Sequence, residues 1–191
     1  FEPVVQETGS FAGNDAPFAK LDGERGAFYN ESGFTFLYNV ARSPGRVDAP
    51  YTVDWKLEDV RGRIEAGAEP HLRLHALTPC DEVALATGDP PFKPQRLRYL
   101  IQSRLGADVQ SQFINVLEPY DKTPFIKQVR ALAVQHDADP SNVAAVAVEL
   151  TDGRTDIVIS CESPTHVTVG GGVTFNGTFG LVRLANGAVQ L

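Results

Sequence analysis

Apolar and polar residues alternate with a period of two along most of this chain, and the remaining apolar runs are short and rich in β-branched residues. The runs are bounded by Gly, Pro, Asn or Asp, as strands separated by turns are. Many short strands at regular spacing are typical of a β-sandwich or barrel. We therefore predict an all-β fold, an antiparallel β-sandwich of several sheets. The twelve predicted strands span residues 34–41, 51–58, 71–77, 82–87, 96–105, 109–118, 125–134, 142–151, 154–162, 166–170, 173–177 and 178–185.

Two dipeptides predict tight turns between these strands. Asp152-Gly153 joins two apolar runs, and Asn186-Gly187 lies near the end of the chain. Both pairs tolerate the positive φ angles of a tight hairpin. Residues 142–149 can also be read as a helix, but three valines in eight residues favour a buried strand. We expect residues 1–25 to form an irregular lead-in and residues 89–94, with three prolines, to form a loop.

The stretch Glu118-Pro119-Tyr120 lies where one predicted strand gives way to the next. Proline cannot donate a hydrogen bond to a sheet and pushes the preceding residue towards an extended conformation. We therefore predict that the strand ends at Glu118 and that residues 121–124 complete a turn. A structural role is predicted for both Glu118 and Tyr120.

Composition limits the class of protein. The chain has 191 residues, 42% of them hydrophobic, which is enough to bury a substantial core as one large β domain or as two small ones, and we predict a single domain. A formal net charge of −7 and a pI of about 5.0 disfavour nucleic acid and anionic membranes as partners. The sequence contains no run of 18 apolar residues and no basic leader followed by an apolar stretch. Because it begins at Phe1 and contains no Met, we expect it to be a fragment of a longer protein.

The two cysteines, Cys80 and Cys161, lack the short spacing of a zinc knuckle or a redox pair. We predict that they are unpaired buried thiols, with a single disulfide as the alternative. The sequence patterns G-x-S-x-G and H-E-x-x-H and a glycine-rich phosphate loop are also missing. The sequence therefore predicts neither a metal nor a cofactor.

Two polar strand faces are candidates for binding. HLRLHAL (71–77) places His71, Arg73 and His75 on one face of a strand, because side chains alternate along it. His71 and His75 lie about 13 Å apart by strand rise, which is too far for both to bind one metal ion. A solvated face, or one that contacts a neighbouring domain, is the simplest interpretation, and a face turned towards a ligand is the alternative.

The second polar face belongs to RLRYLIQSR (96–104), which places Arg96, Arg98 and Arg104 on one side of the strand. Guanidinium groups can bind carboxylate or sulfate through two parallel hydrogen bonds, so this strand is a candidate for an acidic ligand. Charges on surface strands also prevent aggregation, which is the alternative interpretation.

Four aromatic residues present a similar choice. They can form a platform on which sugar rings stack, but in strands with a period of two such residues more often pack in the core. We predict packing for Tyr38, Tyr51, Trp55 and Tyr99.

The order of the segments carries a resemblance to a known family. The segments are FTFLYNVARSPGRVDAPYTVDWKLED, HLRLHAL, DEVALATGDPPFKP, LRYLIQSR, QSQFINVLEPYDKTPFIKQVRAL, LTDGRTDIVISCES and FGLVRL. In sequence and order they resemble the C-terminal β-rich region of the heparinase II/III-like polysaccharide lyases, across residues 20–185. The most specific part is F-x-x-V-x-E-P-Y followed by P-F-I, carried by Phe113, Val116, Glu118, Pro119, Tyr120, Pro124, Phe125 and Ile126.

The resemblance implies a multidomain enzyme with an N-terminal α/α toroid, which cleaves heparin-, heparan- or alginate-like uronate polysaccharides by β-elimination. In this reaction a base removes the proton at C5, an acid protonates the leaving oxygen, and a neutraliser stabilises the carboxylate. In the family the catalytic tyrosine belongs to the toroid, and the catalytic histidine lies upstream of any segment matched here. This chain has no histidine before His71, so the resemblance transfers no catalytic residue.

We therefore expect the chain to pack against the toroid and to form one wall of a cleft for acidic polysaccharide, without cleaving it alone. The candidate wall residues are Arg96, Arg98, Arg104, His71 and His75. A periplasmic or secreted bacterial location is expected, with a cytoplasmic one as the alternative. Two other functions remain open, namely a stand-alone carbohydrate-binding module and a structural module that contacts no sugar.

Overall fold

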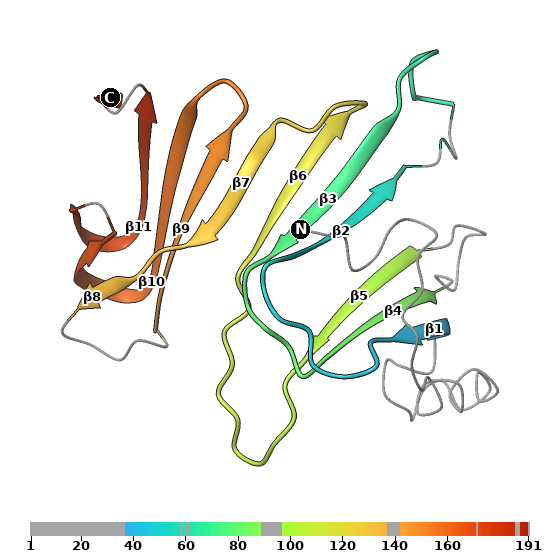
Figure 1. Cartoon of the computed structure of the whole chain (residues 1–191), viewed down its shortest axis with the longest axis horizontal. Helices are drawn as coiled ribbons and strands as arrows, with labels where there is room; N and C mark the ends of the chain where they lie inside the picture. Colours follow the sequence, from blue (N-terminus) through green and yellow to red (C-terminus); the bar gives the residue numbers. More distant parts are fainter. Residues whose placement is uncertain are drawn as a thin grey trace.

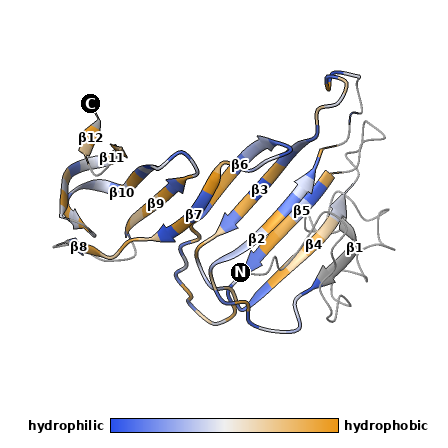
Figure 2. Cartoon of the chain, turned by 45° about the horizontal axis from the view of Figure 1, so that its top comes forward, coloured by the Kyte–Doolittle hydropathy of each residue, from blue (hydrophilic) through white to orange (hydrophobic). Residues whose placement is uncertain are grey.

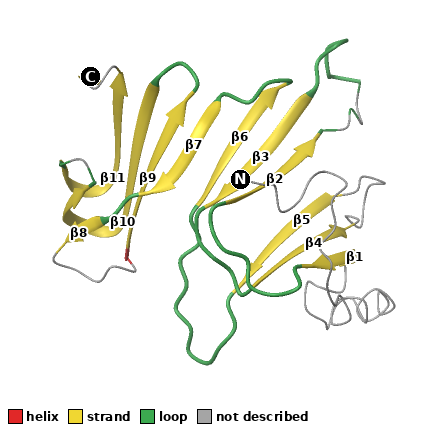
Figure 3. Cartoon of the chain, viewed as in Figure 1, coloured by secondary structure: helices red, strands yellow, loops and turns green. Residues whose placement is uncertain are grey.

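The computed structural model describes residues 37–57, 59, 62–88, 97–136, 142–170, 172–185 and 188–190. Strands and loops make up almost all of this part of the chain (Figure 3). Every strand pair is antiparallel, which confirms the predicted all-β class. The strands are β1 (Leu37–Arg42), β2 (Tyr51–Lys56), β3 (Pro70–Ala76), β4 (Glu82–Gly88), β5 (Leu97–Ser103), β6 (Asn115–Asp121), β7 (Ile126–Ala131), β8 (Val134–His136), β9 (Val143–Leu150), β10 (Arg154–Val169), β11 (Val173–Ala185) and β12 (Ala188–Gln190).

Two three-stranded sheets, β1-β4-β5 and β2-β3-β6, form the first half of the molecule (Figure 1). Apolar residues alternate with polar ones along β3, as Figure 2 shows, so the β2-β3-β6 sheet has one apolar face and one polar face. Tyr51, Val53 and Ala76 from one sheet share a buried cluster with Val83 from the other. The β2-β3-β6 sheet therefore turns its opposite face away from this core.

The third sheet has the order β12-β11-β10-β9-β7, and β8 pairs with the far end of β10. The pairing of β10 with β11 shifts register between Ser160 and Thr165, which bends the two long strands. Val167 beyond the bend then packs in the same buried cluster as Ile159 before it. This sheet thus curls over a core of its own.

The two halves meet where β6 leads into β7. Val129 and Val148 on the outer face of the large sheet form a cluster with Ile114 and Val116, which lie immediately before and within β6. A buried cluster of this kind stabilises the junction by removing apolar surface from water.

The predicted strand boundaries agree with the structure in some places and differ in others. Val143–Leu150 form strand β9, as predicted, and the predicted turn follows at Asp152-Gly153, where Gly153 has a φ of 87°. Arg154–Val169 form one long strand where two were predicted, because the bulge interrupts the pairing without ending the strand. The predicted lead-in at 1–25, the loop at 89–94 and Asn186-Gly187 lie outside the described residues.

The predicted corner at Glu118-Pro119-Tyr120 is wrong, because these residues lie within β6. Pro119 is tolerated there because β6 is an edge strand of its sheet, where a missing N–H donor breaks no continuous ladder. The turn predicted over residues 121–124 is confirmed, because β6 ends at Asp121 and Lys122 has a left-handed φ of 57°. The stretch is therefore a strand that carries side chains in register with β3.

A glycine in β11 gives a test of the packing in the third sheet. A Cβ added at Gly180 would lie 2.7 Å from Cε2 of Phe175, whereas one added at Gly45 meets nothing within 4 Å. We expect Gly180→Ala to lower the free energy of unfolding by about 1–3 kcal/mol, because the ring must shift within a packed cluster. Gly45→Ala is the matched control and should change it by less than about 1 kcal/mol. Urea denaturation measures both, and equal stability of the two variants would contradict the packing.

Candidate functional site

The polar face of the β2-β3-β6 sheet carries a group of polar side chains that are hydrogen-bonded to one another. Asp54, Arg73 and Glu118 lie opposite one another across the three strands, and His71 lies opposite Tyr120 in the next row. Residues directly opposite one another across strands, and those two apart along a strand, share a face. Strand alternation therefore gathers side chains from three distant segments on the face away from the core.

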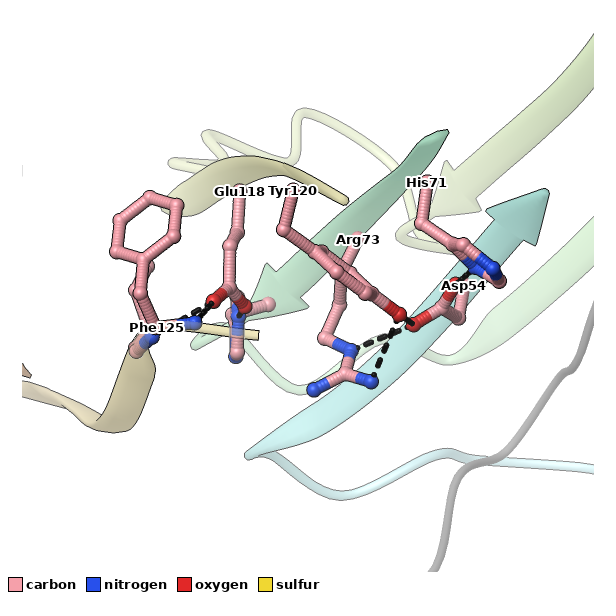
Figure 4. Close-up of polar contacts among 8 residues, drawn as sticks. Asp54, His71, Arg73, Glu118, Tyr120 and Phe125 are labelled. Carbon is pink, nitrogen blue, oxygen red and sulfur yellow. Dashed lines mark hydrogen bonds and ion pairs between the residues drawn. The ribbon is translucent and has the colours of Figure 1, made fainter. Parts of the chain in front are cut away.

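Asp54 is the centre of this network (Figure 4). Its carboxylate accepts hydrogen bonds from Nδ1 of His71 at 2.7 Å, Nε of Arg73 at 2.7 Å and Oη of Tyr120 at 2.5 Å. Arg73 also donates from Nη2 to Oη of Tyr120 at 3.1 Å. One carboxylate thus connects β2, β3 and β6.

Burial and hydrogen bonding set the protonation states of Asp54 and Tyr120. Burial alone would raise the pKa of Asp54, but hydrogen bonds from Tyr120, His71 and Arg73 outweigh it and lower that pKa. Burial, followed by the hydrogen bond to Asp54, raises the pKa of Tyr120 to about 12. At neutral pH Asp54 is therefore ionised, and Tyr120 is a neutral hydroxyl that cannot serve as a phenolate base.

The ring of Tyr120 also holds its neighbours in place. It stacks on the imidazole of His71, with centroids 5.0 Å apart and planes 16° apart, and the guanidinium carbon of Arg73 lies 5.1 Å from its centroid. Among the described residues, Nε2 of His71 and Nη1 of Arg73 have no hydrogen-bond partner. These two nitrogen atoms are what the network offers to a ligand.

Glu118 serves a different purpose from Asp54. Its side chain is fully buried, and Oε1 accepts hydrogen bonds from the backbone N–H groups of Phe125 at 2.7 Å and Ile126 at 2.6 Å. Oε2 lies 2.9 Å from Nε2 of His75. The carboxylate therefore ties β6 to β3 and to the first residue of β7, which supports the structural role predicted for it.

The structure does not gather the five predicted wall residues on one surface. His71 and His75 lie on the polar face of β3, where each contacts a carboxylate. Arg98 lies in the other small sheet, on the same face of β5 as Leu100, which packs against the shared core. The guanidinium of Arg98 donates a hydrogen bond to Oγ1 of Thr87 at 2.8 Å. Arg104 is exposed just beyond the end of β5, and Arg96 lies outside the described residues. Only the two histidines thus share a face.

Two members of the network, Asp54 and Tyr120, were absent from the predicted site. Asp54 is the single acid in the strand YTVDWK and lies between Val53 and Trp55. An isolated acid between two apolar residues of a strand was the feature of the sequence that could have identified it. Its partners depend on the register between strands, which periodicity alone does not supply. Tyr51 and Trp55 belong to the buried core as predicted, Tyr99 is 40% exposed, and the side chain of Tyr38 lies outside the described part.

Other kinds of site are not found in the described part of the chain. No group of three or more His, Cys, Asp or Glu side chains there is arranged to hold a metal ion. Cys80 and Cys161 are free and buried, which confirms the prediction of unpaired thiols. No helix among the described residues has the length and apolar character needed to span a membrane.

Comparisons of the chain with protein-family models, with curated proteins and with solved structures found no match.

The buried carboxylate of Glu118 can be tested with an isosteric substitution. We expect Glu118→Gln to lower the free energy of unfolding by about 1–3 kcal/mol, because the amide is a weaker acceptor for two backbone N–H groups and His75. Glu149→Gln is the control, because Glu149 pairs with the half-exposed Arg130. This substitution should lower the free energy of unfolding by less than about 1 kcal/mol. Chemical denaturation gives both values, and a fully stable Glu118→Gln variant would contradict the role of Glu118 at the junction.

The lowered pKa of Asp54 predicts a dependence of stability on pH. A carboxyl group whose pKa is lower in the folded state contributes stability above its unfolded pKa of about 3.9 and loses it as pH falls through the folded pKa. The difference in unfolding free energy between wild type and Asp54→Asn should therefore be largest near neutral pH and shrink in acid. Asp48→Asn, at a carboxylate 85% exposed, is the control and should differ little from wild type throughout. If the difference in unfolding free energy between wild type and Asp54→Asn grew as the pH fell, the lowered pKa of Asp54 would be contradicted.

Proposed function

We propose that this chain is the β-sandwich portion of a heparinase II/III-like polysaccharide lyase, an enzyme that cleaves uronate-containing polysaccharide by β-elimination. In this proposal the chain packs against an α/α toroid of the same enzyme and completes one wall of its substrate cleft. Because such polymers lie outside cells, the proposed location is the bacterial periplasm or the exterior.

One observation carries this proposal. Three segments that resemble the family, YTVDWKLE, HLRLHAL and VLEPY, are far apart in the sequence, yet their polar residues meet in one network. Asp54 comes from the first, His71 and Arg73 from the second, and Tyr120 from the third. The resemblance therefore follows residues that act together on one face of a sheet, and is not confined to apolar positions that any β-sandwich requires.

The chemistry of this face suits binding more than proton transfer. A lyase needs a base for the C5 proton and an acid for the leaving oxygen. The phenol of Tyr120 has a raised pKa and donates to Asp54, while Asp54 already accepts three hydrogen bonds. The network thus supplies a rigidly held guanidinium donor on Arg73 and an imidazole acceptor on His71, and the proposal assigns base and acid to residues outside this chain.

The proposal is tested with the longer polypeptide encoded by the same gene. We expect it to convert a uronate polysaccharide into products with a C4–C5 double bond, detected by ultraviolet absorbance. The isolated chain should bind the polysaccharide without forming that product. Absence of elimination by the longer protein on every uronate polymer tried would contradict the proposal, and sugar binding without elimination would instead favour a stand-alone carbohydrate-binding module.

A further inference from the structure

The polar face of the β2-β3-β6 sheet carries no excess of positive charge. Its two cations, Lys56 and Arg73, are matched by two carboxylates, Asp54 and Glu118, so the formal charges cancel with the histidines neutral. Arg73 forms an ion pair with Asp54, and Nζ of Lys56 lies 3.5 Å from Oε2 of Glu69 beside the sheet. A ligand that binds here meets one guanidinium donor, Nη1 of Arg73, one imidazole acceptor, Nε2 of His71, and little net attraction.

Most other arginines in the described part of the chain are neutralised in the same way. Each of the following forms an ion pair with at least one carboxylate: Arg42, Arg46, Arg130, Arg154 and Arg183. The whole chain carries a formal net charge of −7. Tight binding of a densely charged polyanion depends on a stripe of free cations that displace its counterions, and these charges do not form one.

We infer that the polymer recognised by this chain is a uronate polysaccharide without sulfate groups, and that the β2-β3-β6 face contacts it through His71 and Arg73. This inference rests on the proposed function and selects one class among its substrates. A polymer whose charge is confined to one carboxylate per sugar suits a face with few free donors and no surplus charge.

The positions of the two free nitrogen atoms support contact with a sugar unit. His71 and Arg73 are two residues apart on β3, so their backbones are about 7 Å apart. The ring of Tyr120 and the carboxylate of Asp54 lie between their side chains (Figure 4). Arg73 can therefore donate to a uronate carboxylate while Nε2 of His71 accepts from a hydroxyl group further along the sugar chain, so the two nitrogen atoms do not converge on a single anion.

The inference is tested by calorimetric titration of the chain with two tetrasaccharides, an alginate-type oligouronate and a heparin-type sulfated one. We expect the oligouronate to bind with an affinity that changes little between low and physiological salt, and the sulfated sugar to bind no more tightly. Arg73→Met should weaken oligouronate binding roughly 10- to 100-fold, the loss of one charge-assisted hydrogen bond. His71→Gln should also weaken it, while Arg98→Met and Arg104→Met, outside this face, should not.

Circular dichroism of each variant establishes folding before titration, and His71→Gln remains informative if Arg73→Met does not fold. Tighter, steeply salt-dependent binding of the sulfated sugar would overturn the inference and leave the proposed function standing. If Arg98→Met lost binding while Arg73→Met and His71→Gln bound like wild type, the assignment of the contact to this face would be overturned. Binding of neither sugar would overturn the inference together with the sugar contact in the proposed function.

Discussion

The arrangement of the two halves of this molecule depends on one buried carboxylate. Glu118 is fully removed from solvent, and a charge in that position is tolerated only when hydrogen bonds replace the water it has lost. Those hydrogen bonds come from His75 in β3 and from the backbone at the start of β7. The hydrogen bonds that the carboxylate of Glu118 needs therefore fix the path of the chain as it leaves the small sheets and enters the large one.

The same register that places Glu118 at the junction places Asp54, Arg73, His71 and Tyr120 on one face of the small sheet. Tyr51, Val53 and Ala76 are fully buried on the other face, so the sheet cannot slip by one residue without exposing its core. The polar network is thus held by apolar packing behind it, and its own hydrogen bonds join the three strands in front. A surface of this kind is rigid without a bound ligand, which suits the recognition of an extended sugar chain.

Alternation along each strand was enough to predict the all-β class, the location of most strands and the shared face of His71, Arg73 and His75. It was not enough to predict the partners of these residues, because Asp54 and Tyr120 meet them through pairing between strands. The corner predicted at Pro119 failed for a related reason. A proline ends a central strand but is accepted at a sheet edge, and the position of a strand within its sheet is a property of the whole fold. Arg98 was grouped with the histidines by charge alone, whereas the fold places it in the other small sheet.

If the β2-β3-β6 face contacts uronate, the imidazole signals of His71 should change when uronate binds. His71 lies in the network with Nε2 free among the described residues, while His166 is exposed on β10 in the large sheet. Proton–nitrogen NMR spectra of the histidine side chains, recorded during titration with an unsulfated oligouronate, distinguish the two. The account predicts a saturable shift of the His71 signals with those of His166 unchanged. A shift at His166 with His71 unaffected would contradict it.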